Sequence, residues 1–367
     1  MHDRSSPKSP IRFVCSLLAI VLFASGAQAA CTTFCMSAGG RFVFGANYDW
    51  DTGVGMLMVN KRLVSKESLT LRPTRWTSRF ASITLNQYGR EFPTGGMNEA
   101  GLVVALMALA DTQYPAVDSR PSVGILEWIQ YQLDLSADID EVLQRAAQIR
   151  IAGQMGLHYL VSDRTGRAVT FEYLGGTIVA HHDGTLPFAV LTNDTYDRSI
   201  AYLRTITGFG GTRPVPTGIG SLERLAQAAS MIRQTDPSAN AVERAFTILD
   251  AVHQPYYTKW SVVYDPNAMT VYFRTDRNPN VRSLSFGSFD GACAFPVKTL
   301  DINGDGSGDM AAFVDDYSSE ANTALVYAAY AQTPMLRDAT DDDKHETAMH
   351  PEGDVCVQVP RGRAVRR

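Results

Sequence analysis

The order of hydrophobic patterns along the chain is the feature that most limits its fold. Short apolar and β-branched runs, typical of strands, fill the first third, and residues 102–107 are one example. Between residues 125 and 149 the apolar positions recur instead at helical spacing, with Asp138 and Glu141 placed to begin a helix. Strand-like and helical segments then alternate once more. This series predicts one layered α+β domain.

The second half of the chain continues the alternation. The expected elements are strands at 158–162, 168–173 and 188–192, helices at 222–232 and 241–252, and a hairpin formed by 260–264 and 270–274. A Gly/Pro/Thr-rich loop is expected at 198–217 and a final helix at 321–331. The chain after Pro334 is polar, so we expect it to be loose and treat residues 335–367 as a C-terminal tail.

The first thirty residues are typical of a secretory signal peptide. Basic residues precede an apolar run at 13–24, and Ala27-Gln28-Ala29 supplies small residues where a signal peptidase cuts. The run is about a dozen residues long, short of the ~20 that a membrane span needs. We therefore expect a periplasmic or secreted protein without an integral membrane domain, whose main domain occupies 31–334.

Composition narrows the class of partner. The chain has 367 residues, of which 45% are hydrophobic and 19% charged, as in folded soluble proteins. Its formal net charge is −5. A cationic surface for nucleic acid is not expected from such a balance, and a small-molecule substrate fits it better.

The five cysteines divide by position. Cys15 lies in the signal segment. Cys31 and Cys35, if they lie in one strand, are about four rises of ~3.3 Å apart, which is too far for a disulfide. Cys293 and Cys356 lie in the last quarter, and we hypothesise a bridge between them that ties the tail to the body.

Cys31 stands directly after the expected cleavage position. Processing would leave it at the new amino terminus, or one residue from it, and an α-amino group with a pKa of about 7.7–8.0 can act as the base for its own thiol. If the peptidase cuts after Ala29, the thiol is expected to remove Ala30 itself. Lipid attachment is an alternative, although Gln28 stands where that signal has an aliphatic residue. A buried structural cysteine is another.

Five blocks occur in one order along residues 31–290. They are Cys31–Phe34, Phe44–Trp50, Gly96–Leu102, Leu191–Asp194 and Ser221–Arg224. In this order they resemble the choloylglycine hydrolase and penicillin V acylase family, N-terminal-nucleophile amidases that cleave linear amide C–N bonds. The resemblance implies a four-layer αββα sandwich, and it implies a homotetramer as the oligomeric state.

The resemblance also implies roles for four residues. Cys31 matches the nucleophile, Asp49 the carboxylate that holds the amine and thiol, Asn193 the side chain that donates to the oxyanion, and Arg224 the arginine near the nucleophile. Each has an ordinary alternative when taken alone: Asn193 as a turn former, Arg224 as a surface charge and Asp49 as a strand-end cap.

Two positions depart from the family pattern. Ala46 stands where many members have an arginine, and Ala108 where a second oxyanion donor is often found. The first change leaves less positive charge beside the thiol, and the second leaves a backbone N–H as the substitute donor. An inactive or lipid-anchored binding protein of the same fold is therefore the alternative to an amidohydrolase.

The expected substrates are N-acyl amides: penicillin V, N-acyl homoserine lactones or conjugated bile salts. No metal or organic cofactor is implied. An apolar acyl pocket is expected, although each candidate could equally be a core residue. The candidate lining residues are Met56, Met58, Tyr88, Met107 and Leu109.

Three further motifs carry weaker signals. Asp301–Asp309 has the oxygen spacing of a calcium loop, but Ala312 stands where the bidentate glutamate belongs, so a polar surface loop is the alternative. His181-His182 has no third ligand at a suitable spacing. Gly208–Gly211 lacks the context of a phosphate-binding loop.

Overall fold

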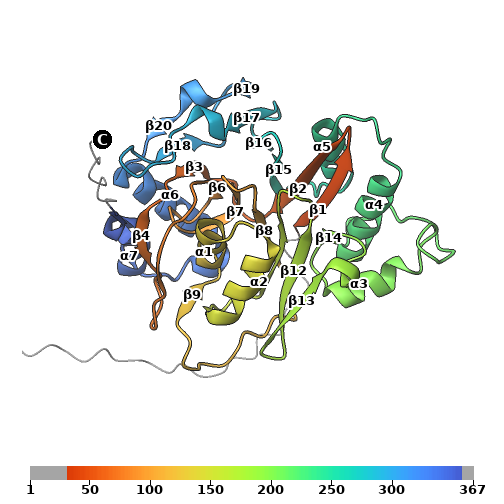
Figure 1. The fold of residues 1–367 in the computed structure, drawn as a ribbon, viewed down its shortest axis with the longest axis horizontal. Coiled ribbons are helices and arrows are strands. Elements are labelled where there is room, and N and C mark those ends of the chain that lie inside the picture. Colours follow the sequence, from red (N-terminus) through yellow and green to blue (C-terminus); the bar gives the residue numbers. More distant parts are fainter. Residues whose placement is uncertain (1–30, 358–367) are drawn as a thin grey trace, which may run out of the picture.

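The computed structural model describes residues 31–357, and two facing β-sheets form the body of the domain (Figure 1). The predicted signal peptide, Cys15 and the last ten residues lie outside the described residues. The first sheet has the order β14 (Val190–Leu191), β1 (Thr32–Ala38), β2 (Arg41–Asp49), β15 (Thr258–Asp265), β16 (Thr270–Thr275), β17 (Arg282–Ser285) and β19 (Gly308–Asp309).

The second sheet is larger and lies against the first. Its order is β13 (Thr177–His182), β12 (Ala168–Leu174), β11 (Leu157–Ser162), β8 (Val103–Ala108), β7 (Pro93–Asn98), β6 (Ser82–Asn86), β3 (Met56–Asn60), β18 (Lys298–Asp301) and β20 (Asp315–Asp316). Short strands form two small accessory sheets: β9 (Ser122–Gly124) with β10 (Arg150–Ala152), and β4 (Val64–Glu67) with β5 (Arg75–Thr77) and β21 (Val355–Cys356).

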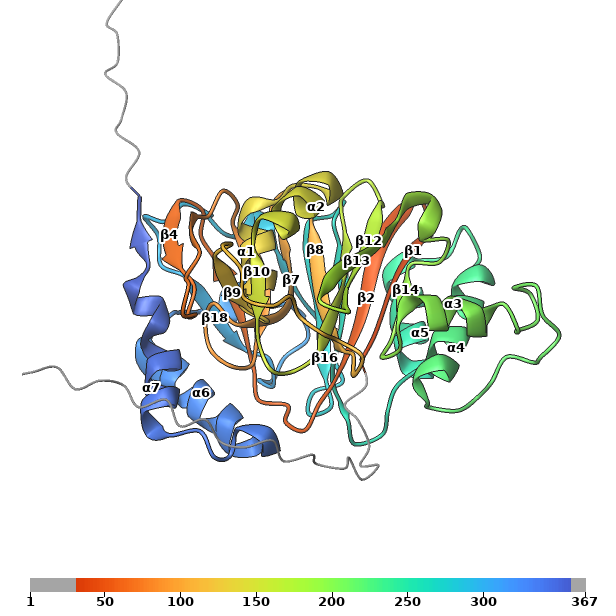
Figure 2. The same ribbon diagram turned by 90° about the horizontal axis from the view of Figure 1, so that it is seen from below.

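Helices cover the outer faces of both sheets (Figure 2). On the first sheet lie α4 (Ser221–Arg233) and α5 (Ala241–Ala251), with α3 (Tyr196–Leu203) beside α4. On the second lies α1 (Glu127–Leu135), with α2 (Ile139–Gln148) on the same side. The predicted α+β class and the four-layer αββα arrangement are confirmed.

The helix predicted from Asp138 and Glu141 shows how local sequence sets an element. Asp138 is the N-cap of α2, and its carboxylate accepts a hydrogen bond from the Glu141 backbone N–H at 2.9 Å. Ile139, Val142 and Ala146 recur at helical spacing and are buried.

The first hairpin positions the start of the domain. Gly39 and Gly40, both with positive φ, form the two-residue turn between β1 and β2, a conformation that glycine adopts without strain. The antiparallel register pairs Thr32 with Asn47. Cys31, one residue earlier, therefore lies level with the end of β2, where Asp49 stands.

Residues 335–357 are ordered, and for them the expectation of a loose chain was wrong. α6 (Ser319–Gln332) packs against α7 (Asp341–Met349), and β21 then pairs with β4. Thr340 caps α7 by accepting from the Asp343 N–H, and Thr347 is buried. The sequence did not predict α7 because the helix is mostly polar and only a few of its residues are buried.

The predicted Cys293–Cys356 disulfide is confirmed. It joins β21 to the segment between β17 and β18 across 63 residues of sequence. Cys31 and Cys35 are free, as expected. Within the described residues, none of the helices has the length and apolar character to cross a membrane.

Removing this disulfide should destabilise the protein. A cross-link over this separation restricts the unfolded chain, so the Cys293→Ser, Cys356→Ser double variant should lose about 2–4 kcal/mol of unfolding free energy. Urea unfolding of the variant and the oxidised parent measures the difference. Coincident midpoints with equal slopes would contradict the expectation, and the parent under reducing conditions is the matched control.

Candidate active site

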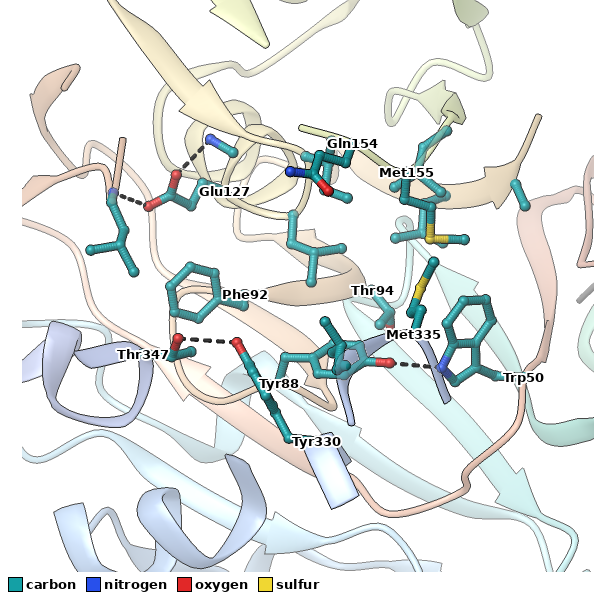
Figure 3. A pocket seen from close by; sticks show the side chains of 18 of the residues that line it. Trp50, Tyr88, Phe92, Thr94, Glu127, Gln154, Met155, Tyr330, Met335 and Thr347 are labelled. Carbon is teal, nitrogen blue, oxygen red and sulfur yellow. Dashed lines mark hydrogen bonds between the residues drawn. The ribbon is translucent and has the colours of Figure 1, made fainter. Parts of the chain in front are cut away.

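A cavity of about 470 Å³ lies beside the start of β1, and the Cys31 residue lines it. Figure 3 shows aromatic and sulfur-containing side chains converging on it, among them Trp50, Tyr88 and Met335. A mostly apolar cavity of this size is typical of a site for a small organic molecule. The lining residues are Cys31, Tyr48, Trp50, Leu69, Tyr88, Phe92, Thr94, Leu106, Ala108, Gly124, Ile125, Leu126, Glu127, Ala152, Gln154, Met155, Leu157, Tyr330, Met335, Leu336 and Thr347.

The Cys31 thiol is buried, and only 4% of the residue is exposed. Its Sγ lies 3.8 Å from the backbone carbonyl oxygen of Asp49. Burial, and then the negative charge of Asp49, raise the pKa of the thiol to about 12, while the positive charge of Arg224 acts in the opposite direction. In the chain that still continues upstream of Cys31, the thiol is therefore protonated and unreactive at neutral pH.

The Asp49 side chain is buried at the end of β2. Its Oδ2 accepts from Gln254 Nε2 at 2.6 Å, and its Oδ1 accepts from Thr258 Oγ1. Burial raises the pKa of this carboxyl group to about 6, and the hydrogen bond from Thr258 limits the rise. These hydrogen bonds hold the Asp49 carboxylate in a fixed position, where it could pair with a neighbouring cation.

Arg224 connects two of the other candidate residues, Cys31 and Asn193. It projects from the first turn of α4, and its Nη1 donates to the Cys31 carbonyl oxygen at 2.8 Å. Nη2 donates to Asn193 Oδ1 at 2.8 Å, and Nε donates to the Ile219 carbonyl oxygen at 2.9 Å. The guanidinium is fully buried. Its donors are thus used to hold the backbone at Cys31 and the amide of Asn193, which is a positioning role.

Asn193 follows β14 and is held from three directions. Arg224 binds its Oδ1, its backbone N–H donates to Ser221 Oγ at 3.0 Å, and its Nδ2 donates to the Ala108 carbonyl oxygen at 2.9 Å. An amide nitrogen carries two protons, so one N–H is left for a further acceptor. Asn193 does not itself line the cavity, but its amide donates to Ala108, which does, and it shares Arg224 with Cys31.

Sequence reasoning missed a buried pair behind Asn193. His158 Nε2 lies 2.7 Å from the carbonyl oxygen of Thr192, and its Nδ1 lies 3.3 Å from Glu172 Oε1. Because a carbonyl only accepts, Nε2 carries the proton. The pair fixes the backbone just before Asn193. The available signal was a histidine and a glutamate at positions inside two otherwise apolar strand runs.

The predicted substrate-binding residues mostly lie elsewhere. Tyr88 lines the cavity, whereas Met58, Met107 and Leu109 are completely buried and do not line it, and neither does Met56. The reason is the two-residue period of a strand: Leu106 and Ala108 of β8 reach the cavity, so Met107 between them points to the other face. There its sulfur accepts from Thr33 Oγ1 at 3.0 Å.

The glycine-rich Asp301–Asp309 loop is organised around an arginine. Nη1 of Arg282 donates to the carbonyl oxygens of Ile302 and Gly304 at 2.7 and 2.9 Å. Asn278 Nδ2 donates to the Gly304 carbonyl as well, at 2.9 Å. The oxygens that Arg282 binds belong to residues 302 and 304, which alternate with the 301, 303, 305, 307 and 309 positions of the calcium spacing. Nowhere in residues 31–357 do three or more His, Cys, Asp or Glu side chains gather as a metal site would require.

Fold and site together define an αββα sandwich with a buried thiol at the start of its first strand, beside an apolar cavity. The sequence model of the linear amide C–N hydrolases, choloylglycine hydrolase family, matches residues 31–229. The chain belongs to this family, whose members are hydrolases of linear amide C–N bonds, and the predicted resemblance is confirmed.

Individual relatives agree with this assignment. Penicillin V acylase of Pectobacterium atrosepticum is 24% identical over 344 residues, covering 77% of this chain and 89% of the relative. The structure of penicillin V acylase from Agrobacterium tumefaciens is 26% identical, with a TM-score of 0.70 over 78% of this chain and 98% of that one. A conjugated bile acid hydrolase variant from Clostridium perfringens, 16% identical, shares the fold, with a TM-score of 0.64 over 74% of this chain and 97% of that one.

Proposed function

We propose that this chain is an exported cysteine amidohydrolase that cleaves an N-acyl amide through a thioester on Cys31. The observation that carries the proposal is the joint placement of three groups: Cys31 borders an apolar cavity, and Arg224 links its backbone to the amide of Asn193. A cavity, a thiol and an amide donor meeting at one end are the parts that acyl transfer needs.

In the proposed reaction the chain begins at Cys31. The thiol proton passes to the free α-amine, and Sγ attacks the carbonyl carbon of the bound amide. Negative charge develops on the carbonyl oxygen, where the remaining Asn193 N–H donates to it. The C–N bond then breaks as the proton moves from the ammonium to the leaving nitrogen. Water attacks the thioester, which releases the carboxylic acid and restores the thiol.

The two departures from the family pattern shape this proposal. The carbonyl of Ala108 accepts from Asn193, so this position helps to hold the donor although it has no polar side chain of its own. Ala46 borders a small void of about 20 Å³ between the sheets, next to Tyr48 and Trp260. Among the side chains near Cys31, the charge of Arg224 favours the thiolate, and the proposed oxyanion donor is Asn193.

The cavity favours an aromatic acyl group among the three candidate substrate classes. Five aromatic rings line it: Tyr48, Trp50, Tyr88, Phe92 and Tyr330. Rings of this kind make large contacts with a flat apolar group. Two of the proteins similar to this chain are named penicillin V acylase. We therefore place phenoxyacetyl amides, such as penicillin V, ahead of N-acyl homoserine lactones and conjugated bile salts.

A substrate panel tests the function. Protein whose intact mass begins at Cys31 is incubated with penicillin V, an N-acyl homoserine lactone and a glycine-conjugated bile salt, and the released amine is measured. We expect turnover of the phenoxyacetyl amide, and acid-quenched samples should carry the acyl mass on the Cys31 peptide. Absence of turnover with all three would favour the alternative of a binding protein.

The proposed site of action is outside the cytoplasm. The Cys293–Cys356 disulfide supports it, because disulfides persist in oxidising compartments. Fractionation of cells that make the full chain should recover the protein, with its amino terminus processed, in the periplasm or the medium.

A further inference from the structure

One wall of the cavity comes from the C-terminal segment, residues 319–356. Tyr330 on α6, Met335 and Leu336 in the turn after it, and Thr347 on α7 all line the same cavity as Cys31. The family model that matches this chain ends at residue 229, well before the segment begins. The family assignment therefore says nothing of what this wall does.

Hydrogen bonds connect this wall directly to the catalytic end of the cavity. Trp50, the residue after Asp49, donates through Nε1 to the Tyr88 hydroxyl at 2.7 Å, and that hydroxyl lies 3.0 Å from Thr333 Oγ1 (Figure 3 shows the first contact). Thr333 uses its own proton on the carbonyl of Ala329, so Tyr88 is the donor to Thr333. The end of α6 is thus fixed relative to Trp50.

Aromatic contacts hold the ring of Tyr330 at a set angle. It meets Tyr88 edge-on, with 6.1 Å between ring centroids, and its hydroxyl lies 3.1 Å from Thr347 Oγ1 on α7. In Figure 3 the rings of Tyr88 and Tyr330 stand side by side on the wall opposite Gln154. Tyr330 is consequently a preformed surface, which needs little ordering when a ligand arrives.

The segment is anchored firmly at its far end. β21 pairs with β4 and is covalently joined to Cys293. Next to it, Asp354 Oδ2 lies 3.2 Å from Arg90 Nη2, and Arg90 Nε lies 3.5 Å from Glu91 Oε1. Glu91 in turn contacts Lys66 at 2.7 Å, and all these side chains are largely buried. Two independent ties, one covalent and one ionic, therefore hold the segment as a fixed wall.

Met335 differs from its neighbours because 61% of it is exposed although it borders the cavity. Figure 3 places it between Trp50 and Met155, at the end of the cavity that Trp50 marks. The flexible methionine side chain can fit against an aromatic ring, and the contact between its sulfur and the ring is favourable. An acyl ring that lay against Trp50 would cover Met335 too.

The buried carboxylate that lines the cavity, Glu127, already has hydrogen-bond partners. Glu127 accepts from the backbone N–H groups of Leu69 and Gly124 through its two oxygens, at 2.5 and 2.6 Å. His350 Nε2 of the C-terminal segment lies 3.6 Å from it. Since these groups satisfy the carboxylate, the surface left to a ligand is mostly apolar and aromatic, with the Gln154 side chain as a polar group on the facing wall.

We propose that the C-terminal segment determines acyl specificity, with Tyr330 and Met335 as specificity-determining residues that enclose an aromatic acyl ring against Trp50. This proposal rests on the proposed amidase function for its kinetic readout. The ligand class is an arylacetyl or aryloxyacetyl amide, and a linear acyl chain of similar size is the competitor that the wall disfavours.

The test compares two acyl groups on one amine. Met335→Ala and Tyr330→Leu are made, with Phe313→Ala as the control: Phe313 is 64% exposed and does not line the cavity. We expect each wall variant to lower the ratio of kcat/KM for the phenoxyacetyl amide to that for the hexanoyl amide about tenfold or more. Phe313→Ala should leave the ratio unchanged. Because Met335 is mostly exposed, its truncation should not impair folding, which thermal unfolding checks.

A binding measurement distinguishes a wrong specificity proposal from a wrong assignment of the amidase function. The same substitutions are made in the Cys31→Ala protein, and the dissociation constants of both amides are measured by calorimetry. If the parent turns nothing over, the amidase function fails, and the ratio of dissociation constants alone decides the role of the wall. Ratios that match the parent in both wall variants would overturn the specificity proposal.

Discussion

Replacing Cys31 by alanine should abolish amide hydrolysis, and replacing it by serine should leave only traces. Without the thiol no thioester forms, and a serine hydroxyl is a far weaker nucleophile at neutral pH. We expect kcat/KM for the best substrate of the panel to fall by a factor on the order of 10³ or more. Release of the free amine, followed with protein of verified amino-terminal mass, measures the loss.

Two other variants calibrate this result. Cys35→Ser removes the second free thiol, which lies in β1 away from the cavity lining, and should keep full activity. Asn193→Ala keeps the proposed nucleophile but removes the proposed oxyanion donor, so it should lose about 10²–10³ in kcat. Turnover by Cys31→Ala that equals the parent would refute the nucleophile assignment.

The part of the fold that follows from local patterns was predictable from sequence. The helix capped by Asp138 and the hairpin of β15 and β16 depend on contacts a few residues apart, and both formed as expected. The C-terminal region was not predictable in this way. Its helix α7 is polar overall, and the chain beyond it is held by partners more than two hundred residues upstream, such as Arg90, which pairs with Asp354.

Within the candidate site, sequence reasoning identified residues better than it identified roles. Cys31, Asp49, Asn193 and Arg224 are joined by contacts, as their matching blocks suggested. The sequence could not show that the donors of Arg224 are used on backbone and amide oxygens. The sequence also could not show which alternate residues of β8 face the cavity. Neighbouring residues of a strand face opposite sides, so Ala108 lines the cavity and Met107 is buried on the other face.

The same limit explains the missed residues. His158 and Trp50 lie within or beside apolar strand runs, where a histidine or a tryptophan is ordinarily part of the core. Tyr330 belongs to the helix predicted at 321–331, and Met335 to the predicted tail. Only the three-dimensional arrangement brings these positions to one cavity with Cys31.

Removing the residues before Cys31 should convert an inert thiol into a reactive one. With a peptide bond on its nitrogen, Cys31 has no free amine, and burial raises the pKa of its thiol to about 12. A free α-ammonium next to it adds a positive charge, which favours the thiolate and lowers that pKa. At pH 8 a thiol with a pKa of 12 is ionised only to about one part in 10⁴, so a fall toward the ordinary cysteine value of ~8.5 raises the thiolate fraction by about 10³.

Alkylation by iodoacetamide measures this change residue by residue. In protein that retains Ala30, the labelling rate of Cys31 should rise about tenfold per pH unit up to pH 10, because deprotonation continues until pH exceeds the raised pKa. In protein that begins at Cys31, labelling should be fast and level off at a lower pH. Cys35, whose thiol pKa burial also raises to about 12, is the internal control and should react slowly in both proteins.

Hydrolytic activity should differ between the two forms in the same way, because in the proposed mechanism the α-amine accepts the proton of the thiol and then supplies the positive charge that stabilises the thiolate. Protein that retains Ala30 should be inactive until Ala30 is lost, and activity should appear in step with the change in intact mass. Equal labelling and equal turnover by the two forms would contradict the role of the free amine. A Cys31→Ala chain that still loses Ala30 would instead show that another protease performs the processing step.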